Sequence, residues 1–389
     1  RAIAQGSSER NISIIINEND TKKALNTLHE AFFEKYVKTL NLFIVGVGNV
    51  GSKLIEQIRK QKKYLNDYLR LRIKIIAIAN SKKTLVDATS VDTKNWRKKL
   101  DSGDKTNLNN LFHIVKRLNL RNSIFIDNTA DERVSSEYKR YLENNIGVIT
   151  CNKIACADSF KNYKTLKTVS RKFNSPFLFE TNVGAGLPVI DTLSNLIASG
   201  DQIIKIEAIL SGSLNYIFNN FKNDDSFHKI VEDAMEKGLT EPDPRIDLSG
   251  IDVARKILIL ARESGLEIEL GDVEINSFLP KEVCDIDETN LFLESLKKYK
   301  SHFNSYLKSA RSNKSSLKYV ASLNGSKAKV GLREIYPGHD FFNIKGSDNI
   351  ILFYTSRYKD NPLIVKGAGA GAEVTASGIF GDIIRIGKR

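Results

Sequence analysis

The sequence predicts an α/β protein with a Rossmann-type, doubly wound parallel sheet and a second α+β domain. From Leu42 onward, strand-like and helix-like runs alternate, which is typical of βαβ units. A glycine-rich loop at 46–51 lies between the first of these strands and a helix-like run. After Pro188 the alternation ends and a different mixture of helices and strands begins. A chain of 389 residues is long enough for two or three domains.

Composition narrows the class of protein. Hydrophobic residues make up 41% of the chain and charged residues 27%, which is the range of soluble globular proteins. No apolar run approaches the roughly 20 residues of a membrane span, and no charged-then-apolar leader opens the sequence. We therefore expect a cytoplasmic protein with no membrane partner. Cys151, Cys156 and Cys284 are too few and too irregular for a disulfide framework or a zinc site.

The net charge of +13 raises the question of nucleic-acid binding. The cations are scattered along the chain, and no basic stretch interleaved with aromatic residues is present. Two basic groups, at 59–63 and 297–300, lie in helix-like runs, where cations near a C-terminus oppose the partial negative charge of the helix end. We interpret the charge as a solvated basic surface and expect no nucleic-acid partner.

Residues 1–40 are expected to form a separate N-terminal unit. They contain one alternating strand, at Ile12, Ile14 and Ile16, and one helix-like run, Thr21–Lys35, which is too little to fold alone. The sequence starts at Arg1, and its only methionine is Met235, so we interpret it as a fragment of a longer protein. This stretch resembles the last strand and helix of an ACT domain, a small-molecule regulatory module. The alternative is an N-terminal embellishment of the next domain.

The Rossmann domain is expected over residues 41–180. Its expected strands are Leu42–Val45, Ile73–Ala79, Ile124–Ile126, Gly147–Thr150 and Phe177–Phe179. Its expected helices are Ser52–Tyr64, Asp131–Asn144 and Ser159–Phe173. Because helices separate successive strands, neighbouring strands should run parallel.

A second domain, for substrate binding and dimerisation, is expected over residues 181–356. Its expected elements are a strand at Ile203–Leu210, a long helix from Ile251, a helix at Glu288–Arg311, and strands at Leu317–Leu323, Ala328–Ile335 and Ile350–Ser356. The C-terminal segment, 357–389, is expected to return to the Rossmann domain.

The glycine loop predicts a dinucleotide site. It consists of Gly46, Val47, Gly48, Asn49, Val50 and Gly51. The preceding strand and following helix supply the context that a bare GxGxxG pattern lacks. Gly46 permits the tight turn, Gly48 lets the backbone approach the pyrophosphate, and Gly51 lets helix and strand pack closely. The pyrophosphate would then bind free N–H groups at the helix N-terminus.

The end of the second strand favours NADP over NAD, although NAD stays possible. An acidic residue usually holds the ribose 2′-hydroxyl there, but this sequence has Asn80. Lys82 and Lys83 follow and could accommodate a 2′-phosphate. The alternative is that both lysines are ordinary loop residues.

The stretch from Gly238 to Lys256 carries the strongest chemical pattern. Two prolines make its first part rigid and non-helical. Asp252 and Lys256 are four residues apart on the following helix, so they share one face. A surface salt bridge is the usual interpretation of such a pair. Here the apolar run at 257–260 and the preceding Glu241 and Asp247 favour an active site instead.

Four long motifs now identify a family resemblance. They are ETNVGAGLPVI (180–190), ILSGSLNYIFN (209–219), EPDPRIDLSGIDVARK (241–256) and GAGAGAEVTASG (367–378). Together they resemble homoserine dehydrogenases, and most closely the C-terminal half of bifunctional aspartokinase–homoserine dehydrogenases, in which an ACT tail precedes the Rossmann domain. The resemblance covers essentially the whole chain. It implies NAD(P)H-dependent interconversion of L-aspartate 4-semialdehyde and L-homoserine in threonine and methionine biosynthesis, by a homodimer or higher homo-oligomer.

The resemblance also implies roles for single residues. Lys256 matches the catalytic lysine that exchanges a proton with the substrate oxygen, and Lys153 matches a second lysine at the cofactor–substrate junction. Glu241 and Asp252 match carboxylates that hold the substrate, and Asp247 is a weaker candidate for that task. Further matches are the cofactor contacts Thr129, Gly238 and Gly371, and a monovalent-cation site, thought to bind sodium through oxygen ligands, at Glu180, Val183, Ala185 and Leu187. The last run could equally be a cofactor-facing turn with no metal.

Two rival functions need consideration. Cys151 could be a thiol nucleophile, as in acylating aldehyde dehydrogenases, but it would need a histidine partner. None of the five histidines lies in a motif-like setting. A non-catalytic, amino-acid-binding regulatory protein is the second rival. The intact set of Glu241, Asp252 and Lys256 argues against it.

Overall fold

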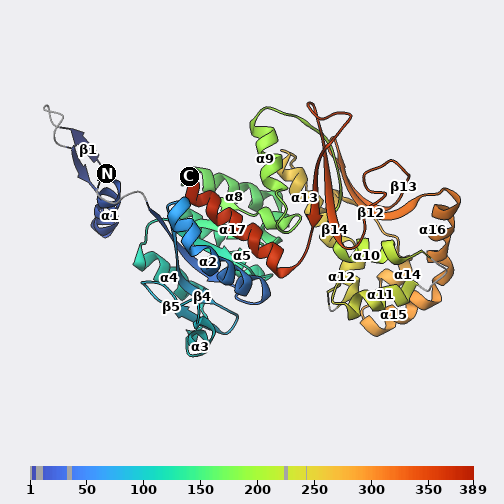
Figure 1. The fold of residues 1–389 in the computed structure, drawn as a ribbon, viewed down its shortest axis with the longest axis horizontal. Coiled ribbons are helices and arrows are strands. Elements are labelled where there is room, and N and C mark those ends of the chain that lie inside the picture. Colours follow the sequence, from blue (N-terminus) through green and yellow to red (C-terminus); the bar gives the residue numbers. More distant parts are fainter. Residues whose placement is uncertain (1, 6–11, 33–36, 223–226, 242) are drawn as a thin grey trace.

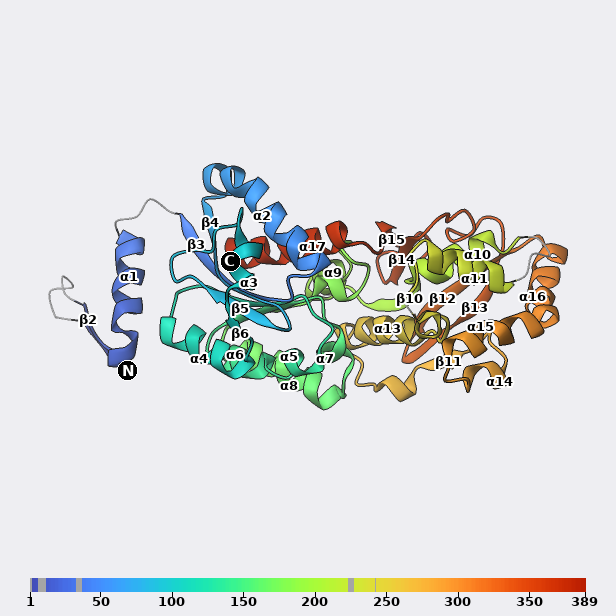
Figure 2. The same ribbon diagram turned by 90° about the horizontal axis from the view of Figure 1, so that it is seen from below.

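Two sheets divide most of the chain into two domains, with a small N-terminal unit at one end (Figure 1). The structure is a computed structural model that describes residues 2–5, 12–32, 37–222, 227–241 and 243–389. The first domain is built on a seven-stranded sheet and the second on a six-stranded sheet. Helix α13 (Ile251–Glu263) lies where the two domains meet (Figures 1 and 2).

The first sheet confirms the predicted parallel, doubly wound core. Its strand order is β6-β5-β4-β3-β7-β8-β9. The five parallel strands are β3 (Lys38–Val45), β4 (Leu71–Ala79), β7 (Ser123–Asp127), β8 (Gly147–Thr150) and β9 (Phe177–Leu178). An antiparallel edge, β5 (Lys83–Val86) and β6 (Asp104–Lys105), was not predicted, because both strands are short and β6 is entirely polar.

Helices cover both faces of this sheet (Figure 2). One face carries α2 (Asn49–Tyr68) and α17 (Ala372–Lys388), and the other carries α4 (Leu108–Leu118), α6 (Tyr138–Glu143) and α8 (Phe160–Lys172). Residues in β3 alternate between these layers. Leu42 and Ile44 join the core under α2 and α17, whereas Phe43 and Val45 join the core on the opposite face. A strand buried on both faces is continuously apolar, as a parallel core strand should be.

The second sheet is largely antiparallel, with order β11-β13-β12-β10-β14-β15. Within this second sheet, as far as the structure describes its residues, β11 and β13 are the only neighbours that pair in parallel. The strands are β10 (Ile203–Ile209), β11 (Glu274–Asn276), β12 (Ser316–Asn324), β13 (Lys327–Ile335), β14 (Asp348–Thr355) and β15 (Leu363–Ala368). The associated helices include α9 (Ile190–Ala198), α10 (Gly212–Asn220), α11 (Phe227–Glu236), α12 (Pro244–Leu248), α14 (Lys281–Cys284), α15 (Thr289–Lys298) and α16 (Lys300–Ser312).

Several predicted boundaries were wrong. The helix predicted at Asp131–Asn144 is two helices, α5 (Glu132–Ser135) and α6, and the one predicted at Glu288–Arg311 is α15 and α16, which meet at Tyr299. Apolar spacing continues across each short break, so periodicity alone does not reveal it. Helices α3 (Trp96–Asp101) and α4 were not predicted. Strand β15 lies in the 357–389 segment but pairs with β14, and only the following α17 packs against α2.

The N-terminal unit is a hairpin and one helix. Strands β1 (Ala2–Gln5) and β2 (Ile12–Ile15) pair antiparallel, and α1 (Thr21–Phe32) follows. Residues 33–35 of the predicted helix lie outside the described residues. Several large apolar side chains of the unit are exposed, including Ile3, Ile15 and Phe32, so its described residues form little core of their own. No helix among the described residues is long and apolar enough to cross a bilayer.

The close approach of α2 to β3 gives a stability prediction for Gly51→Ala. A Cβ at Gly51 would lie 2.0 Å from the carbonyl oxygen of Gly46, a backbone atom that cannot rotate away. Overpacking of this kind costs about 1–3 kcal/mol. We expect calorimetry to show a melting temperature several degrees below that of the parent protein.

Gly381→Ala is the matched control on α17. Nothing lies within 4 Å of a Cβ at Gly381. Alanine is favoured over glycine inside a helix by about 0.5–1 kcal/mol, so the melting temperature should stay the same or rise. Equal melting temperatures for the two variants would contradict the close packing at Gly51.

Candidate active site

Three loops meet at the carboxyl edge of the first sheet. The glycine loop follows β3, Thr129 lies two residues beyond β7, and Lys153 follows β8. Strand order reverses between β3 and β7, since β4 lies on one side of β3 and β7 on the other. In open α/β sheets, ligands bind in the crevice outside the carboxyl ends of strands at such a switch point. The topology therefore places these predicted cofactor residues at one edge of the sheet, next to the switch point.

The glycine loop has the conformation that the sequence predicts. Gly46 adopts a φ of +87°, and a Cβ there would approach the Asn128 backbone to 2.8 Å. Helix α2 begins at Asn49, with Gly48 as its N-cap and no side-chain cap, so no side chain bonds the first amides from that position. Both side-chain polar atoms of Asn128, beside this loop, are buried without a hydrogen-bond partner among the described residues. Unpaired buried polar atoms at a phosphate-type loop are consistent with a bound dinucleotide.

A buried carboxylate organises the loops after β7 and β8, and the sequence analysis missed it. Asp127 is fully buried and accepts hydrogen bonds from the Thr129 amide at 2.7 Å, the Tyr138 hydroxyl at 2.5 Å and the Asn152 side chain at 3.1 Å. Burial raises the pKa of Asp127, and these bonds oppose that effect. The only available signal was an acidic residue at the end of the apolar strand 123–127.

The two predicted lysines converge on Asp252. Lys256 Nζ lies 2.8 Å from Asp252 Oδ2, and Lys153 Nζ lies 3.4 Å from Asp252 Oδ1. Lys256 and Asp252 come from α13, whereas Lys153 precedes α7 (Ile154–Ala157) in the first domain. Lys256 also donates to the carbonyl oxygen of Leu210, at 2.6 Å, at the end of β10. The site therefore takes its cations from both domains.

The charges in this cluster shift the pKa of Asp252. Burial alone raises that pKa, but the attraction of Lys256 and then of Lys153 outweighs it and holds the carboxyl well below its usual range. Asp252 is consequently ionised at neutral pH. Because both its oxygens face ammonium groups, it fixes where those groups lie.

Asp247 lies near the same cluster and orders the neighbouring loop. It accepts a hydrogen bond from the Ser213 hydroxyl at 2.7 Å and from the amide of Glu241 at 2.9 Å. Burial raises the pKa of Asp247. Glu241 itself is exposed, so its carboxylate remains accessible to a ligand. Ser213, in the 209–219 motif, is a second residue whose contact the sequence analysis did not foresee.

Among the described residues, no hydrogen bond or ion pair joins the remaining predicted cofactor residues, Asn80, Lys82, Gly238 and Gly371, to this cluster. Gly238 has a φ of +65° with nothing within 4 Å of a Cβ, and Gly371 caps α17 with a φ of +114°. The Asn80 side chain accepts from the amides of Lys82 and Lys83 at 2.8 and 2.7 Å, which forms a turn. Lys83 Nζ donates to the carbonyl oxygen of Gly103 at 2.8 Å, whereas the Lys82 side chain is exposed. The two lysines therefore differ in the structure, although the sequence analysis gave both the same role: the ammonium of Lys83 is hydrogen-bonded, and the side chain of Lys82 is exposed.

The predicted cation residues form a tight loop after β9. The Glu180 carboxylate accepts from the amides of Val189, Ile190 and Asp191, at 2.7, 2.7 and 3.0 Å, and so caps α9. Ala185 has a φ of +53°. No hydrogen bond from a described residue reaches the carbonyl oxygens of Val183 or Ala185, while those of Glu180 and Leu187 each accept one amide. The described residues contain no group of three acidic, histidine or cysteine side chains arranged for a metal.

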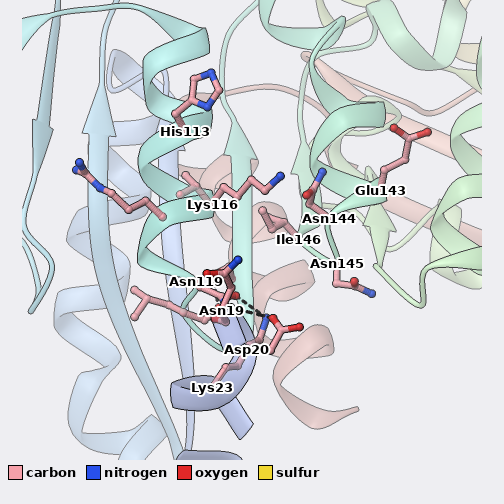
Figure 3. A pocket seen from close by; sticks show the side chains of 14 residues that line it. Asn19, Asp20, Lys23, His113, Lys116, Asn119, Glu143, Asn144, Asn145 and Ile146 are labelled. Atoms are coloured by element: carbon pink, nitrogen blue, oxygen red, sulfur yellow. Dashed lines mark hydrogen bonds between the residues drawn. The ribbon is translucent and has the colours of Figure 1, made fainter. Parts of the chain in front are cut away.

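A separate polar pocket of about 570 Å³ lies away from this chemistry (Figure 3). It lies between the N-terminal unit and the first domain, with Lys23, Asn119 and Asn145 in its lining. Lys23 Nζ donates to the Asn119 side chain at 3.3 Å. The pocket borders Ser123 and Ile146, at the starts of β7 and β8, so it opens at the amino edge of the sheet. None of the predicted site residues lines it.

Family models match nearly all of the chain. A model described as "Homoserine dehydrogenase" matches residues 188–384, and one described as "Homoserine dehydrogenase, NAD binding domain" matches 46–180. A model described as "ACT domain" matches residues 1–32. The homoserine dehydrogenase of Schizosaccharomyces pombe is 36% identical, over 89% of this chain and 95% of its own length.

Bifunctional relatives are similar over a longer stretch of the chain. Bifunctional aspartokinase/homoserine dehydrogenase 2, chloroplastic, of Arabidopsis thaliana is 42% identical over 99% of this chain. The chain spans only 42% of that relative's length.

Solved structures show the same fold. A Candida auris protein described as of unknown function has a TM-score of 0.83 and 33% identity, over 90% of this chain and 99% of its own. A hyperthermophilic archaeal homoserine dehydrogenase in complex with NADPH has a TM-score of 0.70 and 24% identity, over 90% and 98%.

The environment of the three cysteines predicts their reactivity. Burial raises the pKa of the Cys151 thiol to about 12, and burial also raises that of Cys156, whereas Cys284 is exposed. Because the thiolate is the reactive form, iodoacetamide near neutral pH should label Cys284 alone in the folded protein and all three after unfolding. Peptide mapping by mass spectrometry measures this. Rapid labelling of Cys151 in the folded protein would revive the thiol-nucleophile hypothesis.

Proposed function

The chain belongs to the homoserine dehydrogenase family, and from this we propose that it interconverts L-aspartate 4-semialdehyde and L-homoserine with NADPH or NADH. The observation that carries the proposal is the convergence of Lys256 and Lys153 on Asp252, together with a dinucleotide-type glycine loop at the same edge of the first sheet as Lys153. Reduction of an aldehyde needs a hydride for carbon and a proton for oxygen. A positioned ammonium group can supply that proton.

In the proposed mechanism, Lys256 is the proton donor. Its ammonium group protonates the aldehyde oxygen as the carbon receives hydride, which gives the hydroxyl of homoserine. The Leu210 carbonyl and Asp252 hold that ammonium at 2.6 and 2.8 Å, so its direction is fixed before substrate binds. In the reverse direction, neutral Lys256 takes the proton back from the hydroxyl. Lys153, on the cofactor side of Asp252, shares the positive charge facing the substrate oxygen.

Substrate binding is assigned to carboxylates. Asp252 and the exposed Glu241 would hold the substrate and its ammonium group, with Asp247 shaping the loop through the Glu241 amide and Ser213. These roles follow from the family match of each residue, and the hydrogen bond from the Glu241 amide to Asp247, at 2.9 Å, supports the position of the loop that carries Glu241.

The nicotinamide dinucleotide supplies the hydride when bound. The residues proposed to hold it are the 46–51 loop, Asn80, Lys82, Thr129, Lys153, Gly238 and Gly371. The unpaired polar atoms of Asn128 and the uncapped start of α2 support this fit. The turn at 80–83 has no carboxylate to repel a 2′-phosphate, and the exposed Lys82 could bind one. We therefore propose a preference for NADP. Lys83 is not proposed to bind the 2′-phosphate, because its ammonium group donates to the carbonyl oxygen of Gly103.

A monovalent cation, sodium in the proposal, fits the Glu180–Leu187 loop only in part. The Glu180 carboxylate already caps α9, so it is not a free ligand. The carbonyl oxygens of Val183 and Ala185 are available as cation ligands. Those of Glu180 and Leu187 each have a second lone pair that could also bind a cation. Oxygen-only ligation suits an alkali cation, and no catalytic step is assigned to it.

Wider assignments belong to the proposal as well. The ACT match over residues 1–32 and the similarity to bifunctional relatives over 99% of the chain support origin from an aspartokinase fusion. A role in threonine and methionine biosynthesis would follow from the reaction. Self-association through the second domain, as a homodimer or higher oligomer, is proposed from the family match alone. Free cysteines suit a reducing compartment such as the cytoplasm.

A direct assay tests the proposal. L-aspartate 4-semialdehyde should cause oxidation of NADPH, which is measured as a loss of NADPH absorbance. Mass spectrometry should identify homoserine as the product. NADH is tested in parallel. Absence of oxidation with both cofactors would contradict the proposed function.

Lys256→Ala should lower turnover by about 10²–10⁴-fold, because a positioned proton donor contributes about that much. NADPH affinity, measured by fluorescence titration, should change little. Arg255→Ala is the matched control, since Arg255 is the exposed neighbour on the same helix. If the Lys256 variant kept more than about a tenth of parental turnover, its assigned role would be wrong.

Lys82→Ala should raise the KM for NADPH about tenfold while leaving the KM for NADH nearly unchanged, because a charge-assisted bond to phosphate exists only with NADPH. Lys83→Ala, with its ammonium on Gly103 in the parent protein, should affect both cofactors alike. Initial rates over a range of each cofactor measure this. If the Lys82 variant raised the KM for NADPH and the KM for NADH by the same factor, the proposed phosphate contact would be excluded.

A further inference from the structure

Helix α13 of the second domain bonds both ends of helix α7 in the first domain. At one end, Asp252 faces Lys153, the residue just before α7. At the other end, Arg262 Nη1 donates to the carbonyl oxygens of Cys156 and Asp158, at 2.8 and 2.6 Å. These contacts are ten residues apart on α13, or about 15 Å along its axis.

Arg262 is a buried guanidinium whose donors point in several directions. Its side chain has no exposed surface. Besides the two carbonyls of the α7 end, its Nε donates to the Ile268 carbonyl at 3.1 Å, and its Nη2 donates to Glu269 at 3.0 Å. A lysine has one compact ammonium and cannot reproduce this planar fork.

Two glutamates extend the contact into α8. Both oxygens of Glu269 lie within 3.0 Å of the amide nitrogen of Phe160, the first residue of α8. Glu263, the last residue of α13, accepts from Lys167 at 2.9 Å and from the Tyr163 hydroxyl. Charged side chains at and just after the C-terminal end of α13 thus bond to the first domain, which carries Lys153.

We infer that Arg262 and Glu269 are positioning residues that set where Lys153 lies relative to Asp252 and Lys256. Helix α7 is a single turn of four residues, so a shift at its Asp158 end moves its Lys153 end with it. The mechanism needs both ammonium groups at one substrate oxygen, and misplacement by about 1 Å can cost about 10²-fold in rate. The inference rests on the proposed function for the role of Lys153.

A double-mutant cycle tests whether Arg262 acts through Lys153. Arg262→Lys keeps the positive charge but removes the planar guanidinium group and its separate hydrogen-bond donors. It should lower kcat about tenfold to a hundredfold, with NADPH affinity unchanged. In a Lys153→Ala background the same substitution should lower kcat by less than about twofold, because the residue it positions is gone. Glu269→Gln should behave in the same way and serves as a second variant if Arg262→Lys fails to fold.

Lys164→Ala is the matched control. Lys164 on α8 pairs at 2.9 Å with Glu267, which lies in the segment after α13 close in sequence to Glu269. Both of these side chains are exposed, so kcat should stay within about twofold of the parent value. If Arg262→Lys lowered kcat by the same factor in both backgrounds, the inference would be overturned, because the effect of a purely structural residue would not depend on whether Lys153 is present. An unchanged kcat would overturn it too.

Hydrogen exchange gives a readout that does not depend on the reaction. Arg262→Lys should speed amide exchange across 154–160 and leave exchange in the 46–51 loop unchanged. Unchanged exchange at 154–160 would overturn the inference even in an inactive protein. Faster exchange there in a protein whose parent oxidises no NADPH would instead contradict the proposed function alone.

Discussion

The carboxylate of Asp252 receives two ammonium groups that come from different domains, and the geometry of the proposed active site depends on this contact. Lys256 reaches it from one turn along α13, and Lys153 from the loop after β8. Two neighbouring cations repel each other, and a carboxylate between them removes that cost. The low pKa of Asp252 follows from the same arrangement. The substrate oxygen would meet positive charge that was fixed before binding.

Packing supports this contact over a much larger area. One apolar cluster runs without interruption from Phe43 in the first sheet, through Ile257 on α13, to Phe353 in the second sheet. A dry, close-packed core resists small displacements, because its side chains interlock. Polar residues then refine the position, with Asp127 joining the loops after β7 and β8 and Arg262 joining α13 to α7. The site is thus held by apolar packing at long range and by hydrogen bonds at short range.

Sequence spacing predicted the parts of the site that are local in the chain. The glycine loop needs its neighbours only within one strand–turn–helix unit, and Asp252 and Lys256 need only one helical turn. The approach of Lys153 joins residues about a hundred positions apart, so only the family resemblance pointed to it. The antiparallel edge of β5 and β6 was missed because its residues are few and polar. Asp127 and Arg262 could not be recognised, since a charged residue in an apolar run gives no sign of which distant carbonyls or hydroxyls it will meet.

The most direct test of this account is the effect of Asp252→Asn on the steady-state reduction of L-aspartate 4-semialdehyde. The substitution keeps the size of the side chain and removes the charge between Lys153 and Lys256. The account predicts a fall in kcat/KM of at least about a hundredfold, of the order seen when a positioned charge is lost, with NADPH affinity and the melting temperature near parental values. A kcat/KM within about threefold of the parent value would contradict it, because the two lysines would then not need Asp252 to act together.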